Sequence, residues 1–142
     1  MKRPLLALSL TSLLLLGCTS TPDLPDSGGV LQPCGPLPNC VNSENGEGSK
    51  AVDPIAASSA QWQSLKDWLA AQTDWNVVTD NGDVVQAVAI TPTMRFRDDV
   101  QLRFDNTAGV IHVRSSSRLG ISDMGANRAR VERLRAQVAS SK

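Results

Sequence analysis

The sequence contains no tyrosine, a single histidine, two phenylalanines and three tryptophans among its 142 residues. A core built from such a chain relies on Val, Leu, Ile and Ala, with the tryptophans as the expected anchors of packing. Neither charge is in excess, because 14 basic side chains stand against 14 acidic ones. A chain without net charge has no overall attraction for nucleic acid, so nucleic acid is not expected as a partner. The length allows one domain.

A hydrophobic run long enough to cross a membrane is missing as well. The longest apolar stretch, residues 5–16, falls short of the ~20 residues that a transmembrane helix needs. Lys2 and Arg3 precede it, and a positive start followed by a short apolar run is typical of a secretory signal peptide. We therefore expect residues 1–17 to be a signal peptide.

The segment Leu-Leu-Gly-Cys at residues 15–18 resembles the lipobox of bacterial lipoproteins. The resemblance implies cleavage before Cys18, a diacylglyceryl group on its sulfur and an acyl chain such as palmitate on its new amine. Two or more acyl chains hold a protein firmly on a membrane. Thr19 after the cysteine, in place of Asp, implies attachment to the outer membrane, facing the periplasm. A plain secreted protein and an uncleaved N-terminal anchor in the inner membrane are the alternatives.

The chain from Thr19 to about residue 53 is rich in Pro, Gly, Ser, Asn and Asp. Because this composition buries little apolar surface, we interpret residues 18–33 as the lipidated N-terminus and a flexible linker. Cys34 and Cys40 follow, and two thiols in an oxidising compartment predict a disulfide that pins a local turn. A redox pair is the sharper alternative, but redox motifs have two residues between their cysteines. A metal site is weaker still, since no histidine or further cysteine lies nearby.

Residues 34–142 are predicted to form a single α+β domain with an irregular, disulfide-containing start. Ser58 and Gln61 have the spacing of a capping box, which predicts a helix from there to about residue 72. Trp62, Leu65 and Leu69 fall on one face of that helix.

Strand patterns follow at residues 74–79, 84–91, 100–105 and 110–114. A last helix, capped by Ser122 or Asp123, places three apolar side chains on one face: Val131, Leu134 and Val138. The expected fold is therefore α+β, a four-stranded antiparallel sheet with two flanking helices in a two-layer sandwich.

Three segments of the chain resemble segments of a known protein family. They are Pro-Asn-Cys-Val at residues 38–41, Asp-Asp-Val at residues 98–100 and, above all, the long segment from Val113 to Val131. They resemble the bacterial and plastid family known as domain of unknown function 1499, and the resemblance spans roughly residues 34–138. Members often show Ser-Ser where this chain has Asn-Ser at 42–43. The family has no established activity, so the resemblance implies a domain and no particular reaction.

The most concentrated functional signal lies at residues 114–128, where the chain leaves a strand, passes small polar residues and glycine, and enters a helix. Hydroxyl groups, free backbone N–H groups and arginines favour an anion or polar-ligand site. The candidate ligand-binding residues are Arg114, Ser115, Ser117, Arg118, Asn127 and Arg128. The competing interpretation is structural, with Asp98, Asp99 and Asp123 pairing with the arginines and closing the turn.

Catalysis has little support in the sequence. His112 sits mid-strand on the face expected to meet solvent, and the serines lack a Gly-x-Ser-x-Gly elbow. Asp98 and Asp99 are adjacent, so in a strand their side chains point apart. With Asp123 they make only a weak case for Ca²⁺, and no metal or cofactor is expected.

The leading prediction is a non-enzymatic envelope lipoprotein whose domain binds a polar or anionic envelope ligand or a partner. The alternative is a hydrolase or transferase of an envelope substrate that uses Asp98, Asp99 or Asp123 with Ser117 and the arginines.

Overall fold

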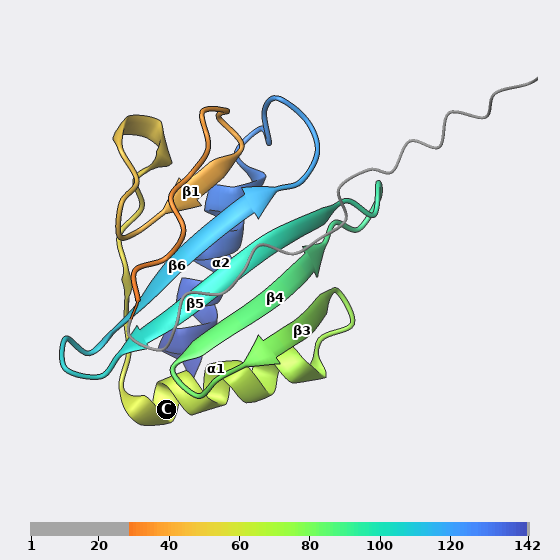
Figure 1. Cartoon of the computed structure of the whole chain (residues 1–142). Helices are drawn as coiled ribbons and strands as arrows, with labels where there is room; N and C mark the ends of the chain where they lie inside the picture. Colours follow the sequence, from red (N-terminus) through yellow and green to blue (C-terminus); the bar gives the residue numbers. More distant parts are fainter. Residues whose placement is uncertain (1–28, 142) are drawn as a thin grey trace, which may run out of the picture.

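The computed structural model describes residues 29–141, so Cys18 and the predicted signal peptide lie outside the described residues. The elements follow one another as β1 (Cys40–Asn42), a 3-10 turn η1 (Gly48–Lys50), β2 (Ile55–Ala56), α1 (Ser59–Ala71), β3 (Trp75–Asp80), β4 (Val84–Ile90), β5 (Arg97–Asp105), β6 (Val110–Ser117) and α2 (Ala126–Ser140) (Figure 1). Within residues 29–141, no helix combines the length and hydrophobicity that a membrane crossing requires.

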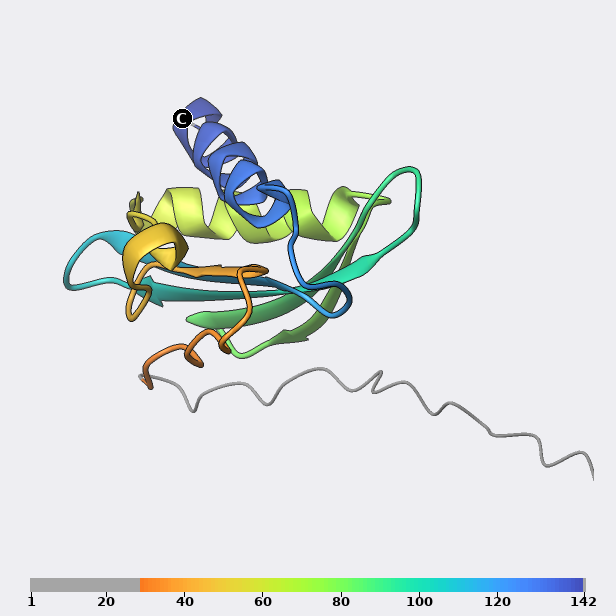
Figure 2. The same cartoon turned by 90° about the horizontal axis from the view of Figure 1, so that it is seen from above.

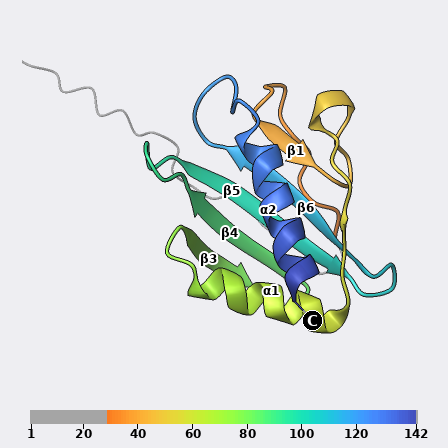
Figure 3. The ribbon, with the colours of Figure 1, turned by 180° about the vertical axis from the view of Figure 1, so that it is seen from behind.

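All strands belong to one antiparallel sheet in the order β1-β6-β5-β4-β3, and β2 pairs with the other part of β6. Both helices lie on the same face of this sheet (Figure 2), so the domain has two layers. Seen from behind, α2 crosses the sheet while α1 runs beside β3 (Figure 3). The antiparallel sheet and the two helices are as predicted, and none of the helices in residues 29–141 lies on the opposite face of the sheet.

The predicted count of four strands is wrong, because residues 29–141 alone contribute six strands to the sheet. The two additional strands, β1 and β2, contain three and two residues. Such lengths are too short to show the alternation of apolar and polar residues by which strands are found in a sequence. They exist because β6 offers partners: Val41 lies opposite Ser115, and Ile55 lies opposite Ile111.

The first helix has the predicted cap and the predicted buried face. Ser58 Oγ accepts from the N–H of Gln61 at 3.2 Å, and Gln61 Oε1 accepts from the N–H of Ser58 at 3.0 Å. Trp62 is buried and stacks on Phe104 with ring centroids 5.8 Å apart, while its Nε1 donates to the carbonyl oxygen of Gly82. The indole therefore anchors α1 to the sheet without leaving its polar atom unsatisfied.

The hydrophobic core lies between the helices and one face of the sheet. From α2 it receives the three predicted residues, Val131, Leu134 and Val138, all at most 2% exposed. The sheet contributes side chains that alternate along each strand, because successive side chains of a strand point to opposite faces. These are Val85, Ala87, Val100, Leu102, Ile111 and Val113.

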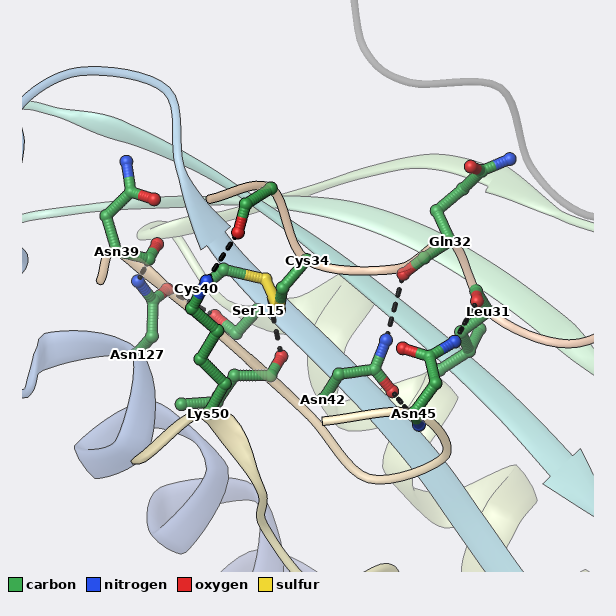
Figure 4. Close-up of a disulfide and its surroundings, with 12 residues drawn as sticks. Leu31, Gln32, Cys34, Asn39, Cys40, Asn42, Asn45, Lys50, Ser115 and Asn127 are labelled. Atoms are coloured by element: carbon green, nitrogen blue, oxygen red, sulfur yellow. Dashed lines mark hydrogen bonds between the residues drawn. A yellow bond between two sulfur atoms is a disulfide. The ribbon is translucent and has the colours of Figure 1, made fainter. Parts of the chain in front are cut away.

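The predicted disulfide between Cys34 and Cys40 is confirmed, with their Cα atoms 5.7 Å apart (Figure 4). It closes the loop that leads into β1. Ordered contacts begin before it, because Leu31 is only 1% exposed and its carbonyl oxygen accepts from Asn45 Nδ2 at 2.9 Å. Asn42 Nδ2 likewise donates to the carbonyl oxygen of Gln32 at 2.8 Å. Side-chain amides thus fasten this segment to the sheet.

Candidate functional site

The segment predicted as the site runs from the end of β6 through a loop into α2. Successive side chains of a strand point to opposite faces, so β6 divides the predicted residues between the two faces. Ser115 and Ser117 contact α2 through Asn127. Arg114 lies on the helix-free face, where its cross-strand neighbours are Gln101 and Asn42.

A buried polar network joins β5, β6 and α2 on the helix-covered face, with Arg130 at its centre. One Arg130 nitrogen, Nη2, donates to Asp98 Oδ2 at 2.6 Å. The other, Nη1, donates to Ser115 Oγ at 2.8 Å and to Asn127 Oδ1 at 2.7 Å. The side chains of Arg130 and Asp98 are 9% and 3% exposed, so this is a buried ion pair with additional hydrogen bonds.

Asn127 connects this network to β1 and to the end of β6. The residue is fully buried, and its Oδ1 also accepts from Ser115 Oγ at 2.7 Å. Its Nδ2 donates to the carbonyl oxygen of Asn39 at 2.8 Å (Figure 4) and also to Ser117 Oγ at 3.1 Å. Every polar atom of the amide is therefore used inside the protein, which suits a positioning role in the first turn of α2.

Arg130 is missing from the predicted site residues, although the sequence holds a signal for it. It lies three residues after Asn127 and four residues before Leu134, which is the spacing of neighbours on one side of a helix. Since Leu134 is expected in the core, Arg130 on the same side of the helix is expected to be buried and to pair there with a carboxylate. Its carboxylate, 32 residues away in sequence, had no such local signal.

On the helix-free face, Arg118 forms a two-bond ion pair with Asp99. Its Nε lies 3.0 Å from Oδ2 and its Nη2 lies 2.7 Å from Oδ1. The hydrogen bond to Asp99 raises the pKa of Arg118. Asp98 and Asp99 thus point to opposite faces of the sheet, as their adjacency in a strand predicted, and each has its own arginine.

Arg114 lies near the same carboxylate but is less well satisfied. The residue is 8% exposed, and neither Nε nor Nη1 has a hydrogen-bond partner in the part of the chain that the structure describes. Burial lowers the pKa of Arg114, and the charge of Asp99 offsets part of that effect. A buried guanidinium in this state is a source of instability, because its lost hydration is only partly replaced.

Asp123 and Arg128 form hydrogen bonds with the backbone at and near the start of α2. Asp123 accepts from the N–H of Asn127 at 2.9 Å and from the N–H of Gly125 at 3.1 Å, so it caps the helix from two residues ahead of the N-cap. Burial opposes its ionisation, but these backbone donors prevail and the pKa of Asp123 lies below its ordinary value. Arg128 Nη2 donates at 2.8 Å to two backbone carbonyls, those of Ser49 and Ala51.

The predicted residues therefore do not form one cluster. Two arginines, Arg114 and Arg118, lie near Asp99 on the helix-free face, whereas Arg128 binds backbone beside η1. The three carboxylates do not gather either. Asp98 and Asp99 lie on opposite faces of the sheet, and Asp123 accepts hydrogen bonds from backbone N–H groups. A phosphate held by all three arginines, or a reaction that uses both Asp98 and Asp99, does not fit this geometry.

Two adjoining cavities lie at the end of the sheet above this network. The first, of about 310 Å³, runs between the ends of β3 and β4 and the side of α2 that carries Ala129, Arg130 and Arg133. The second, of about 220 Å³, runs between the β4–β5 and β6–α2 loops. Thr91 and Ala126 line both cavities, so the two lie side by side. We call the pair the sheet-end groove.

The two parts of the sheet-end groove differ in their chemistry. The second part has polar walls of Asp98, Ser117 and Asp123 and an apolar rim of Phe96, Leu119 and Met124. In the first part the charges are Arg130, Arg133 and Asp74. Arg133 pairs with Asp74 at 2.6 Å and lowers the pKa of that carboxyl through their hydrogen bond.

His112 was expected to face solvent, and the structure leaves it only partly exposed. It lies on the helix-free face as predicted, but its side chain is only 18% exposed. The turn after β1 covers it, with Glu44 Oε1 at 3.8 Å from Nδ1 and with Ser43 Oγ bonded to the neighbouring backbone of Val113. Burial lowers the pKa of His112. In residues 29–141 no three side chains of His, Cys, Asp and Glu gather as a metal site.

Comparison with known proteins adds a family and no activity. Neither a curated protein nor a solved structure matches the chain. The family described as "Protein of unknown function (DUF1499)" matches residues 30–138, which include every strand and nearly all of both helices. The chain therefore belongs to the DUF1499 family.

Proposed function

We propose that this protein is an envelope lipoprotein, held by acyl chains on Cys18, whose domain is a non-catalytic module that binds a small amphiphilic envelope molecule in the sheet-end groove. The lipobox-like segment before Cys18 supports the anchor, and Thr19 supports the outer membrane. The disulfide between Cys34 and Cys40 supports an oxidising compartment such as the periplasm.

The observation that carries the binding function is the composition of the groove. Ligand sites are typically concave and mostly apolar, with a few fixed polar groups. The groove has this character, since Phe96, Leu119 and Met124 form its rim while Asp98 and Ser117 lie on its wall. The polar groups are held in place by the Arg130–Asn127 network, so a ligand meets them without reorganisation.

The charges indicate which end of a ligand lies where. Carboxylates and hydroxyls in the second part of the groove accept hydrogen bonds, which favours a ligand with ammonium or hydroxyl donors there. The guanidinium groups of Arg130 and Arg133 in the first part favour a phosphate or another acceptor. A short apolar tail packs against the rim. This is the chemistry of a lipid headgroup, which an envelope-anchored protein meets at high concentration.

The hydrolase or transferase alternative receives less support. Its carboxylates are each engaged by an arginine or by backbone N–H groups. Ser117 Oγ accepts a hydrogen bond from Asn127, and no described histidine lies near it to act as a base. A binding role requires neither a free carboxylate nor an activated serine.

A steric plug tests the groove. Ala126 lines both cavities, and Ala126→Leu adds bulk to the wall that they share, which narrows both. The probe is dihexanoyl phosphatidylethanolamine below its micelle concentration, followed by NMR shifts of the full-length protein. We expect Ala126→Leu to weaken binding about tenfold or more, the effect of losing roughly 1.4 kcal/mol.

The matched control is Ala136→Leu, the same change at an exposed position of the same helix. It should bind the probe like the wild-type protein. Equal binding by the Ala126→Leu and wild-type proteins, with both folded, would remove the groove from the proposal. The anchor is tested separately, because Cys18→Ala should move the protein from the membrane fraction to the soluble fraction of the envelope.

A further inference from the structure

Exposed hydrophobic side chains gather at one end of the sheet. Of the eight large ones exposed in residues 29–141, five lie in the β4–β5 loop, residues 91–96, and the β6–α2 loop, residues 118–125. They are Met94 at 66%, Phe96 at 43%, Leu119 at 68%, Ile121 at 74% and Met124 at 97% exposed. Both loops lie at the same end of the sheet, opposite the β5–β6 turn (Figure 1), and they share the second part of the sheet-end groove.

Two arginines stand among these side chains. Arg95 lies between Met94 and Phe96, and Arg97 follows directly. Both are exposed, and neither guanidinium has an ion-pair partner in the described part of the chain. The nearest carboxylates in sequence, Asp98 and Asp99, are 2% and 6% exposed and already paired. We call the five apolar side chains together with Arg95 and Arg97 the apolar tip.

The backbone of the tip is fixed, and at two positions it is strained. Thr91 closes the first loop by accepting the N–H of Phe96 on its hydroxyl, while its own N–H donates to the carbonyl oxygen of Phe96, both at 2.9 Å. Arg95 and Met124 have φ values of 56° and 50°, the only left-handed non-glycine residues in residues 29–141. Glycine would relieve this penalty. Strain retained at exposed positions points to a use for the side chains themselves.

We propose that the apolar tip docks on the surface of an anionic lipid bilayer. The apolar side chains and the two arginines, which have no ion-pair partner in residues 29–141, match the boundary between acyl chains and negatively charged headgroups. The carboxylate of the second loop, Asp123, is half-buried and accepts hydrogen bonds from backbone N–H groups. A protein partner would have to offer the same combination of apolar surface and negative charge. The lipid surface is favoured because the tip adjoins a groove whose chemistry suits a lipid headgroup.

This inference rests on the proposed function, because the lipid anchor on Cys18 is what keeps the tip close to a bilayer. Eleven peptide units separate Cys18 from Gly29, the first described residue, and span at most about 40 Å when extended. Strand β5, with nine residues, is about 30 Å long. The tip at the end of the sheet therefore lies within reach of the bilayer that holds the anchor. Docking would open the sheet-end groove toward the lipid surface.

The test places a nitroxide label on the full-length protein in vesicles. Met124→Cys puts the label on the tip, and Thr107→Cys puts it in the exposed turn between β5 and β6 at the opposite end (Figure 3). The disulfide and the lipid on Cys18 leave the introduced cysteine as the thiol that reacts. The vesicles contain phosphatidylcholine with or without phosphatidylglycerol. We expect the label at position 124, and not at position 107, to be shielded from a water-soluble relaxing agent.

Arg95→Gly supplies the charge test, because it removes a cation and relieves backbone strain at the same position. It should lower the ratio of docked to undocked label about fivefold on anionic vesicles, equivalent to about 1 kcal/mol, and change little on neutral ones. Its melting temperature should equal or exceed that of the wild-type protein. A fivefold loss without destabilisation cannot come from misfolding.

The outcomes separate the tip from the anchor. If the protein stays on the vesicles and the label at position 124 remains as accessible as that at position 107, docking of the tip is refuted while the proposed lipid anchor is supported. If the wild-type protein stays in solution and anionic vesicles do not shield position 124, both the lipid anchor and the docking of the tip are refuted. If an envelope protein extract shields position 124 and vesicles do not, the tip binds a protein partner, and the proposal that it docks on a bilayer is refuted.

Discussion

The buried ion pair between Arg130 and Asp98 gives the sharpest stability prediction, because the same helix carries a matched control. Arg130 Nη2 lies 2.6 Å from Asp98 Oδ2, and Arg133 Nη1 lies 2.6 Å from Asp74 Oδ2. The exposed fractions differ greatly: 9% and 3% for the first pair against 46% and 33% for the second. The two pairs thus have the same N–O distance at very different burial, which makes their energies worth comparing.

Arg130→Met leaves Asp98 buried without its cation, which costs about 3–5 kcal/mol. Arg133→Met breaks an exposed pair worth about 1 kcal/mol or less, with up to about 1 kcal/mol more from the guanidinium over Trp68. For a domain of this size, the first loss lowers the melting temperature by about 12 °C or more. Guanidinium unfolding followed by tryptophan fluorescence measures both, since Trp62 and Trp75 are buried.

The double variant Arg130→Met/Asp98→Leu removes both charges and should recover most of the loss, because an apolar pair of similar size often replaces a buried ion pair without penalty. If Arg130→Met is no more destabilising than Arg133→Met, burial does not decide the strength of these pairs. If the double variant is as unstable as the sum of the two single variants, the charges are not coupled.

Three further predictions follow from local geometry. Replacing both Cys34 and Cys40 by serine should lower the free energy of unfolding by about 2 kcal/mol, the chain-entropy value for so short a loop, as seen in chemical denaturation. Ser58→Ala should lower it by about 1 kcal/mol through the lost capping box, whereas Ser58→Asp should not. Because the pKa of Asp123 is depressed on folding, its contribution is present at neutral pH and is lost as the pH falls below the ordinary value of 3.8. Asp123→Asn should therefore flatten the acid side of the stability–pH curve, and an unchanged curve would contradict the assignment.

Periodicity predicted the parts of the fold that are long enough to show it. The helical spacing of Trp62, Leu65 and Leu69 and the strand alternation of residues 100–105 both correspond to buried faces in the structure. The same alternation correctly separated Asp98 from Asp99. Each of these inferences needs only the local geometry of a helix or strand, which a sequence contains.

The remaining features depend on contacts between segments far apart in the chain. Strand β1 exists because β6 pairs with it, 70 or more residues later. His112 is covered because the turn at Glu44 folds back over the sheet. Which arginine meets which carboxylate is equally non-local, since Arg130 lies opposite Asp98 only after α2 has packed on the sheet. Residue types alone predicted that arginines and carboxylates would pair and could not assign the partners.

The position of the Arg130 network connects the fold to the proposed binding surface. Asp98 is the second residue of β5, just after the β4–β5 loop. Ser117 is the last residue before the β6–α2 loop, and Asn127 is the second residue of α2, just after that loop. The network therefore joins the bases of both loops that form the apolar tip. A buried ion pair adds little net stability compared with apolar packing, so we infer that this pair acts mainly by positioning the segments it joins. Fixing these bases holds the two loops at a set separation, which is what a groove between them and a surface shared by both require.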